Sequence, residues 1–125
     1  MSREPDSFEK LVGIDVVDVR DGYAKVSLKV TADHTNFIGI VHGGIVFTLA
    51  DCAFAKAVNS GERVGVAIRA DINFLKASHE GDVLTAEAVR ISESKRLGLY
   101  HIKVYNAQTE LIAFFSGTAY YINKE

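Results

Sequence analysis

The sequence predicts an α+β fold in which one antiparallel sheet of five to six strands wraps around a single long helix. One stretch, 43–59, carries apolar residues at helical spacing on nearly every side, which is typical of a helix covered all round. Six other stretches alternate apolar and polar residues, as half-buried strands do. The 125 residues match the size of one compact domain, so we expect residues 1–125 to form a single domain.

A short helix and a β-hairpin are predicted ahead of the long helix. Charged residues between Pro5 and Gly13 indicate one helical turn that ends at the glycine. The Asp21-Gly22 pair is typical of a tight hairpin turn between two alternating stretches. The expected strands are 14–20 and 23–30, followed by a loop over 31–41.

The long helix is expected from Gly43 to Asn59, where the run Asn59-Ser60-Gly61 is a typical stop signal. Eleven of the eighteen residues from Gly43 to Ser60 are apolar. This stretch is shorter than the roughly 20 apolar residues that a membrane span needs, and polar residues interrupt it. We therefore expect a core helix and no membrane anchor.

Four strands are predicted after the helix, the first of them long and half-exposed. An open sheet leaves unpaired edges, and pairing one edge with a second copy removes that liability. The sequence therefore predicts a homodimer. The expected strands are 64–74, 83–91, 97–106 and 111–122.

Composition disfavours several classes of function. Fourteen Lys and Arg against sixteen Asp and Glu give a net charge of −2 with no basic block, so we expect no nucleic-acid partner. The single cysteine, Cys52, cannot form an internal disulfide, and the first residues lack the apolar run of a secretory signal, which favours a cytoplasmic protein. His34, His79 and His101 show no recognised metal-ligand spacing with one another or with Cys52, so we expect no metal site.

Asp51 is the residue whose position a purely structural role explains least well. It lies in the middle of the long helix, where an ionised carboxylate is costly unless it is paired or its pKa rises. One interpretation places it on a polar stripe, bonded to Thr48 or to solvent at a subunit interface. The other makes it a general base or a nucleophile in a partly desolvated cleft.

The run Val41-His42-Gly43-Gly44 at the start of the helix is a second candidate feature. Gly43 and Gly44 let a ligand approach the backbone, and the free N–H groups at the positive helix end favour an oxygen that develops negative charge. The alternative is that the glycines only allow a sharp turn, with His42 bonded to the loop. Asn36 adds an amide that either braces the loop or reaches the substrate.

Geometry limits how these two features can combine. Gly43 and Asp51 are eight residues apart, which is about 12 Å of helix rise. One copy therefore cannot place both groups on the same carbonyl. Two antiparallel helices related by a two-fold axis can, because the start of one then lies near the middle of the other.

Two further groups are weaker candidates for substrate binding. Lys95 and Arg96 could meet phosphate groups, although such a pair is more often a solvated hairpin tip. Phe47, Phe54 and Phe74 are expected in the core, and some of them would line an apolar tunnel for an acyl chain, Phe47 first among them.

The motifs resemble the signature of hotdog-fold acyl-CoA thioesterases of the phenylacetyl-CoA (PaaI-like) type. The resemblance rests on the run from Asn36 to Gly44, on Leu49-Ala50-Asp51 and on Ala57-Val58-Asn59-Ser60, and the predicted strand order agrees over nearly the whole chain. It implies a hotdog fold and hydrolysis of acyl-CoA thioesters, aromatic such as phenylacetyl-CoA or medium-chain, at a homodimer interface. It also implies a dimer of dimers and no cofactor, since coenzyme A is part of the substrate.

The same resemblance implies roles for individual residues. Asp51 would attack the thioester or activate water, and the Gly43 N–H would be the main oxyanion donor. Asn36 and His42 would position or polarise the thioester. The chain departs from the pattern at Arg69, where related enzymes often carry Ser or Thr, so we expect Arg69 to be a solvated strand residue outside the catalytic set.

Two rival classes of function remain open. A non-catalytic acyl-CoA-binding hotdog module would bind the same thioesters, although the regulators that use such modules need an attached DNA-binding segment. A dehydratase or hydratase would use a different arrangement of His and Asp. Release of free thiol separates hydrolysis from both.

Overall fold

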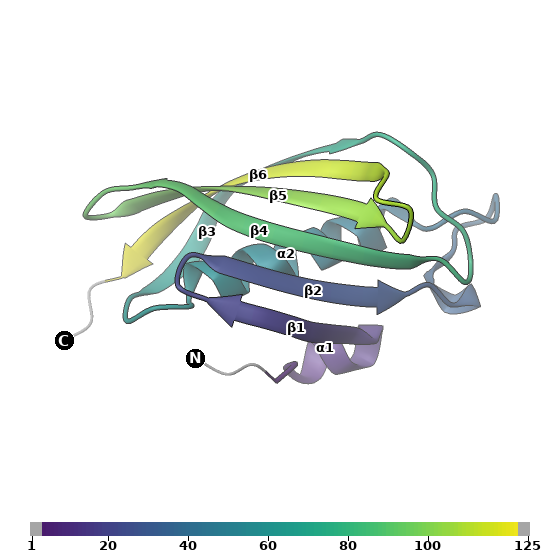
Figure 1. Ribbon diagram of the computed structural model, residues 1–125, viewed down its shortest axis with the longest axis horizontal. Coiled ribbons are helices and arrows are strands. Elements are labelled where there is room, and N and C mark those ends of the chain that lie inside the picture. The colour runs from purple at the N-terminus through teal and green to yellow at the C-terminus, as the bar shows by residue number, and fades with distance from the viewer. Residues whose placement is uncertain (1–3, 123–125) are drawn as a thin grey trace.

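The computed structural model describes residues 4–122 and confirms the predicted architecture of a curved antiparallel sheet around one long helix (Figure 1). Six strands lie in the order β1-β2-β4-β5-β6-β3, so the strand that follows the long helix crosses over to pair with the last strand. The elements are α1 (Ser7–Val12), β1 (Ile14–Arg20), β2 (Tyr23–Lys29), α2 (Gly43–Val58), β3 (Val64–Phe74), β4 (Val83–Glu93), β5 (Leu97–Asn106) and β6 (Leu111–Ile122).

The long helix ends one residue earlier than expected, and the side chain of Asn59 explains why. Its Nδ2 donates to the carbonyl of Ala55 at 2.9 Å and to that of Gly65 at 3.2 Å, and its Oδ1 accepts from the N–H of Gly65 at 3.0 Å. Asn59 therefore closes the last turn of α2 and fixes the start of β3 against it.

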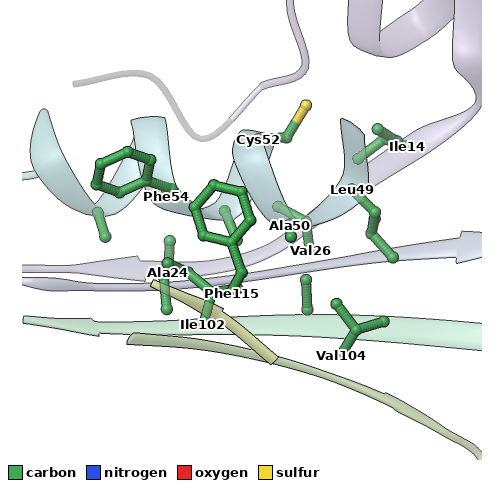
Figure 2. Close-up of a cluster of buried hydrophobic side chains, with 14 of the residues drawn as sticks. Ile14, Ala24, Val26, Leu49, Ala50, Cys52, Phe54, Ile102, Val104 and Phe115 are labelled. Carbon is green, nitrogen blue, oxygen red and sulfur yellow. The ribbon is translucent and has the colours of Figure 1, made fainter. Parts of the chain in front are cut away.

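The sheet-facing side of α2 forms the core. Leu49, Ala50 and Phe54 are at most 1% exposed, and Figure 2 shows Leu49 pointing toward the strands while Phe115 rises from β6 toward the helix. A Cβ on Gly117 of β6 would lie 2.6 Å from the ring of Phe54, so glycine is what lets this ring reach the sheet.

One flank of α2 is covered by the N-terminal helix α1 through a buried ion pair. Lys56 Nζ lies 3.1 Å from Glu9 Oε1, and the two side chains are only 10% and 4% exposed. The same carboxylate accepts the backbone N–H of Asp6, and Asp6 caps Glu9 in return, which completes a capping box. The ion pair and the cap together fix α1 to α2.

Glu9→Ala is expected to lower the free energy of unfolding by about 3–5 kcal/mol, because it leaves the Lys56 charge buried without a partner. Chemical denaturation measures this loss. The double variant Glu9→Leu, Lys56→Met should recover most of it, since two apolar side chains replace the pair. As a control, Glu110→Gln breaks the exposed pair with Lys76, which solvent screens, and it should change stability far less. Equal losses in Glu9→Ala and Glu110→Gln would contradict this account.

The other side of α2 is less covered than the sequence predicted. Ala55 is exposed and Asp51 is half-buried, because the sheet curves around only part of the helix. The neighbouring strand β3 is a free edge of the sheet, and it is long, apolar and mostly exposed. Its exposed apolar side chains are Val64 at 43%, Val66 at 49%, Ile68 at 59% and Phe74 at 57%.

Candidate active site

The start of α2 presents one backbone N–H group that is not hydrogen-bonded. His42 is the N-cap residue, and its Nδ1 accepts the N–H of Gly44 at 2.8 Å, which places the ring proton on Nε2. The N–H of Gly43 has no acceptor among the described residues. At a positive helix end, this free donor suits an oxygen with developing charge. Gly44, also predicted to bind substrate, uses its N–H in the helix cap.

Asn36 braces the loop before α2, which was one of its two predicted roles. Its Oδ1 accepts the N–H groups of Ile38 at 3.1 Å and Ile40 at 3.3 Å, and its backbone N–H donates to the carbonyl of Ile40 at 2.8 Å. Asn36 therefore holds the loop with its oxygen, and its amide Nδ2 has no acceptor among the described residues.

A pocket of about 360 Å³ lies beside the free Gly43 N–H. Its apolar walls come from the helix, from the end of β3 and from β6, and its polar groups come from the loops around them. Ligand sites commonly combine an apolar lining with a few polar groups in this way. The lining residues are Asn36, Ile40, Val41, Gly43, Val46, Phe74, Leu75, Lys76, Ala77, Ser78 and Ile112.

Asp51 carries a half-buried carboxylate with no hydrogen-bond or ion-pair partner within the described part of the chain. The bond to Thr48 that a structural role would provide is not formed. Burial raises the pKa of Asp51 above the ordinary value of 3.8, because the ionised form loses solvation. A carboxylate in this state is more basic than a solvated one, as a general base or nucleophile requires.

Gly43, Phe47 and Asp51 follow one another at four-residue steps and therefore share one flank of α2. The ring of Phe47 packs against Phe115 of β6 with centroids 5.4 Å apart. A Cβ on Gly43 would lie 3.5 Å from the ring of Phe74 on β3. The flank that carries the free N–H and the carboxylate thus faces the free edge of the sheet. Within one protomer, Asp51 lies about two turns beyond Gly43 and is not part of the pocket lining.

The structure does not bring Lys95 and Arg96 to this pocket within one protomer. They lie at the β4–β5 hairpin, where Lys95 O accepts from Arg63 and Arg96 donates to the hydroxyl of Tyr120 at 3.1 Å. Ser78 at the pocket precedes the other end of β4, and the 11 residues of that strand span about 35 Å. Figure 1 shows the β4–β5 hairpin and the β3–β4 loop at opposite ends of the sheet.

Arg69 lies where the sequence analysis expected a solvated strand residue. It is exposed on β3, and its guanidinium donates to Ser116 Oγ at 2.9 Å. It pairs with Thr118, whose neighbours Gly117 and Ala119 are the buried, helix-facing residues of β6, so Arg69 lies on the outer face of the sheet. Its side chain therefore points away from α2 and Asp51.

Sequence reasoning named Phe74 as a core residue that could also line an acyl tunnel, and it did not single out several other residues of the pocket for binding: Val46, Leu75, Lys76, Ala77, Ser78 and Ile112. Phe74 was expected in the core, but it is 57% exposed and covers the Gly43 side of the pocket. Its position at the end of a strand that the alternation predicted to be half-exposed was the signal that could have shown this. Ser78 lies in a loop without periodicity, and no local pattern distinguished it.

The described histidines and acidic residues do not form a cluster that could bind a metal ion. Over residues 4–122, no three His, Cys, Asp or Glu side chains are placed to hold an ion. His34 has a structural role, since its Nδ1 accepts from Thr31 N–H at 2.9 Å and its Nε2 lies 2.7 Å from the carbonyl of Val12. Within residues 4–122, no helix has the length and apolar character needed to span a bilayer.

Comparison with known proteins places this chain in a family. The sequence profile of the thioesterase superfamily matches residues 38–113. Acyl-coenzyme A thioesterase PaaI of Escherichia coli is 40% identical over 119 residues, covering 95% of this chain and 85% of that protein. Human acyl-coenzyme A thioesterase 13 is 31% identical over 111 residues, covering 86% of this chain and 79% of that protein.

Solved structures agree with this assignment. The Escherichia coli PaaI protein superposes with a TM-score of 0.92 at 39% identity, covering 94% of this chain and 86% of that one. A Streptococcus mutans protein bound to acetyl CoA superposes with a TM-score of 0.89 at 25% identity, covering 99% and 98% of the two chains. The architecture is the hotdog fold that the motifs implied. The profile match and the two thioesterase relatives show that the chain belongs to the thioesterase superfamily.

Proposed function

We propose that this protein hydrolyses acyl-CoA thioesters to the free acid and coenzyme A at a site shared by two subunits. The observation that carries the proposal is a pair of unsatisfied groups on one flank of α2. The Gly43 N–H has no acceptor, and the Asp51 carboxylate has no partner among residues 4–122. The thioesterase relatives support the choice of reaction.

The chemistry follows from what each group can donate or accept. The thioester carbonyl oxygen accepts the Gly43 N–H, which stabilises the negative charge that forms when a nucleophile adds to the carbon. Asp51 either takes a proton from the attacking water or attacks directly and is later released by water. When Asp51 acts as a base, the C–S bond breaks after water has added to the carbon. When Asp51 attacks directly, the C–S bond breaks as the acyl anhydride with Asp51 forms, and water cleaves that anhydride afterwards. In both routes the leaving thiolate takes up a proton to become coenzyme A. Asn36 Nδ2 and His42 Nε2 are the further donors that position the thioester.

A homodimer across β3 supplies the geometry that one chain lacks. The edge strand β3 leaves its outer backbone groups unpaired, and the flank with Gly43 and Asp51 faces that edge. A two-fold axis at this edge would place two α2 helices side by side and antiparallel. Gly43 of one subunit then meets Asp51 of the partner subunit. The side chain of Phe37 is 98% exposed in the loop before α2. Such a dimer would bury it.

A dimer of dimers, as the resemblance implied, would use a second surface. The outer face of the sheet carries several exposed apolar side chains, which is uncommon for a surface that stays solvated. They include Val89 at 43%, Ile91 at 51%, Leu97 at 44% and Tyr120 at 36%. We propose this face for the contact between dimers.

The pocket supports an apolar acyl group as the substrate. Val46, Phe74 and Ile112 line it, and its volume of about 360 Å³ admits a phenylacetyl or a medium-chain acyl group. The proposed reaction draws on a backbone N–H and on amide, imidazole and carboxylate side chains, so we propose that it needs no cofactor. Lys95 and Arg96 remain candidates for the coenzyme A phosphates, if the partner subunit brings the nucleotide to that end. The expected compartment is the cytoplasm.

A thiol-release assay across aromatic and straight-chain acyl-CoAs tests the proposal. We expect steady-state turnover with free thiol and free acid formed in equal amounts. Binding that saturates without thiol release would instead identify a non-catalytic acyl-CoA-binding module. Conversion of the acyl group without loss of coenzyme A would identify a dehydratase or hydratase.

A further inference from the structure

The free edge strand β3 carries two opposite charges on the outer face of the sheet. Asp71 pairs with Ser116 of β6, whose neighbour Phe115 is buried on the helix-facing side, so the Asp71 side chain lies on the outer face. Arg69, two residues away, lies on the same face, and both side chains are exposed. Arg69 donates to the neutral hydroxyl of Ser116, and the Asp71 carboxylate has no partner among the described residues.

The other edge strand, β1, carries the same two residue types at the same spacing. There Arg20 Nε lies 3.0 Å from Asp18 Oδ2, so the ion pair forms within one chain. On β3, no ion pair joins Arg69 to Asp71. Both charged groups of β3 therefore remain available to a strand that pairs with this edge.

The proposed active site restricts where a two-fold axis can cross β3. If Gly43 meets Asp51 of the partner subunit, the axis passes level with Phe47, which lies midway between them on α2. The ring of Phe47 packs on Phe115 with centroids 5.4 Å apart, and Phe115 pairs with Ile72 of β3. The axis therefore crosses β3 within about two residues of Ile72.

Charge distinguishes the registers near this point. An axis through Asp71 sets the Asp71 carboxylates of the two subunits opposite each other, which is destabilising. An axis through Ile72, or further toward the end of β3, places no acidic residue of the partner subunit opposite Arg69. An axis through Ala70 sets Arg69 opposite Asp71 of the partner subunit and, by symmetry, forms this pair twice.

We propose that Arg69 of one subunit pairs with Asp71 of the partner subunit, twice, across a two-fold axis through Ala70. Both are positioning residues, because this register holds Asp51 opposite the Gly43 N–H of the partner subunit. The inference rests on the proposed function, since the shared site locates the axis. Solvent screens exposed pairs of this kind, so their effect is to select the register more than to add affinity.

Reversal of each charge tests whether the pairs join two subunits. Asp71→Arg alone sets arginine opposite arginine, and Arg69→Asp alone sets aspartate opposite aspartate. Each variant should therefore dimerise about 10- to 100-fold more weakly than the wild type at low salt. Co-expression of the two variants restores both pairs, but only in the heterodimer. Native mass spectrometry should then find about nine-tenths heterodimer or more, where random pairing gives about half.

Two further variants separate an effect on pairing from an effect on folding. One chain that carries both Arg69→Asp and Asp71→Arg should dimerise like the wild type, because both pairs return with their charges exchanged. Asp18→Arg co-expressed with Arg20→Asp is the matched control on β1, and these two should pair at random. Thiol release should follow the dimer fraction, so it falls in each single variant of β3 and returns in their mixture.

Cysteine cross-linking measures the register directly. The single native thiol is first removed with Cys52→Ala. Only a residue on the axis faces its own copy, so Ala70→Cys should form a disulfide between subunits faster than Ile72→Cys or Asp71→Cys. This comparison needs no charge reversal, and it decides the register if a charge variant does not fold.

The outcomes separate the register from the reaction. Random pairing of the β3 charge variants, or faster cross-linking at Ile72→Cys than at Ala70→Cys, would overturn the inference while hydrolysis by the wild type stands. Failure of the wild type to hydrolyse any acyl-CoA would overturn the proposed function, and this inference with it.

Discussion

Asp51→Asn is expected to lower kcat for acyl-CoA hydrolysis by at least about a thousandfold while acyl-CoA still binds. The amide has the size of the carboxylate, but it can neither accept a proton from water nor attack the thioester. Binding should persist because the pocket beside Gly43 does not include Asp51. Steady-state thiol release measures the loss, and titration with acyl-CoA under the same conditions measures the retained affinity.

The same substitution is expected to keep or raise stability at neutral pH. The pKa of Asp51 is raised in the folded chain, so the folded state binds the proton more tightly than the unfolded state. Stability is therefore lost as pH rises from the unfolded to the folded pKa, and the full cost remains at neutral pH. Asparagine removes this cost. A lower melting temperature for Asp51→Asn at pH 7 would contradict the idea that burial of the unpaired carboxylate is costly.

Asp33→Asn provides the matched control, because Asp33 is an exposed aspartate in the short 3-10 helix Ala32–His34 after β2, outside α2. It should leave turnover and melting temperature unchanged. Wild-type turnover in Asp51→Asn would remove Asp51 from the mechanism. Loss of turnover in both variants would show that the change acts through the fold instead.

The pH dependence of kcat/KM should show an acidic limb from the same group. Asp51 must be ionised to act, so activity is expected to fall as pH decreases through a pKa raised above 3.8 by burial. Asp51→Glu provides a probe, because any residual activity should keep an acidic limb. A rate that stays constant down to pH 4 would exclude Asp51 as the ionising group.

The elements of this fold could be predicted because their periodicity is local. The alternating residues of β3 and the apolar spacing of α2 each indicate the secondary structure of their own segment, and Gly22 with φ of +74° marks the first hairpin. The pairing of β3 with β6 could not be predicted from these patterns, because it joins segments far apart in the chain. That pairing leaves β3 at the edge of the sheet. The flank of α2 that carries Asp51 faces this edge, where we propose that the partner subunit binds.

The candidate site shows the same division. The sequence pointed to Asp51 because an ionised carboxylate is costly in the middle of an apolar helix. Gly43 and Gly44 indicated where that helix begins. The use of the Gly44 N–H in the cap depends on the rotamer of His42, which no sequence pattern specifies. Ser78 gave no signal, since only the three-dimensional structure shows that its hydroxyl is buried without a partner among residues 4–122.

Mixed dimers of Asp51→Asn and Gly43→Pro are expected to recover activity that neither variant has alone. Gly43 is the first residue of α2, where proline is tolerated, and His42 before it has the extended backbone that proline requires, with φ of −62° and ψ of 134°. Proline therefore removes the N–H and keeps the helix. Gly43→Ala keeps the N–H, and its Cβ would make only van der Waals contact with Phe74 at 3.5 Å, so it should remain active.

The amount recovered discriminates between a shared site and a site within one chain. In a heterodimer, the intact Gly43 of one subunit faces the intact Asp51 of the partner subunit, and the second site lacks both groups. Random mixing in equal amounts makes half of the dimers heterodimers, each with one working site, so about a quarter of wild-type activity should return. If each chain used its own Gly43 and Asp51, every site would carry a defect. Mixed dimers that form but show no activity would therefore exclude a site shared across the β3 edge.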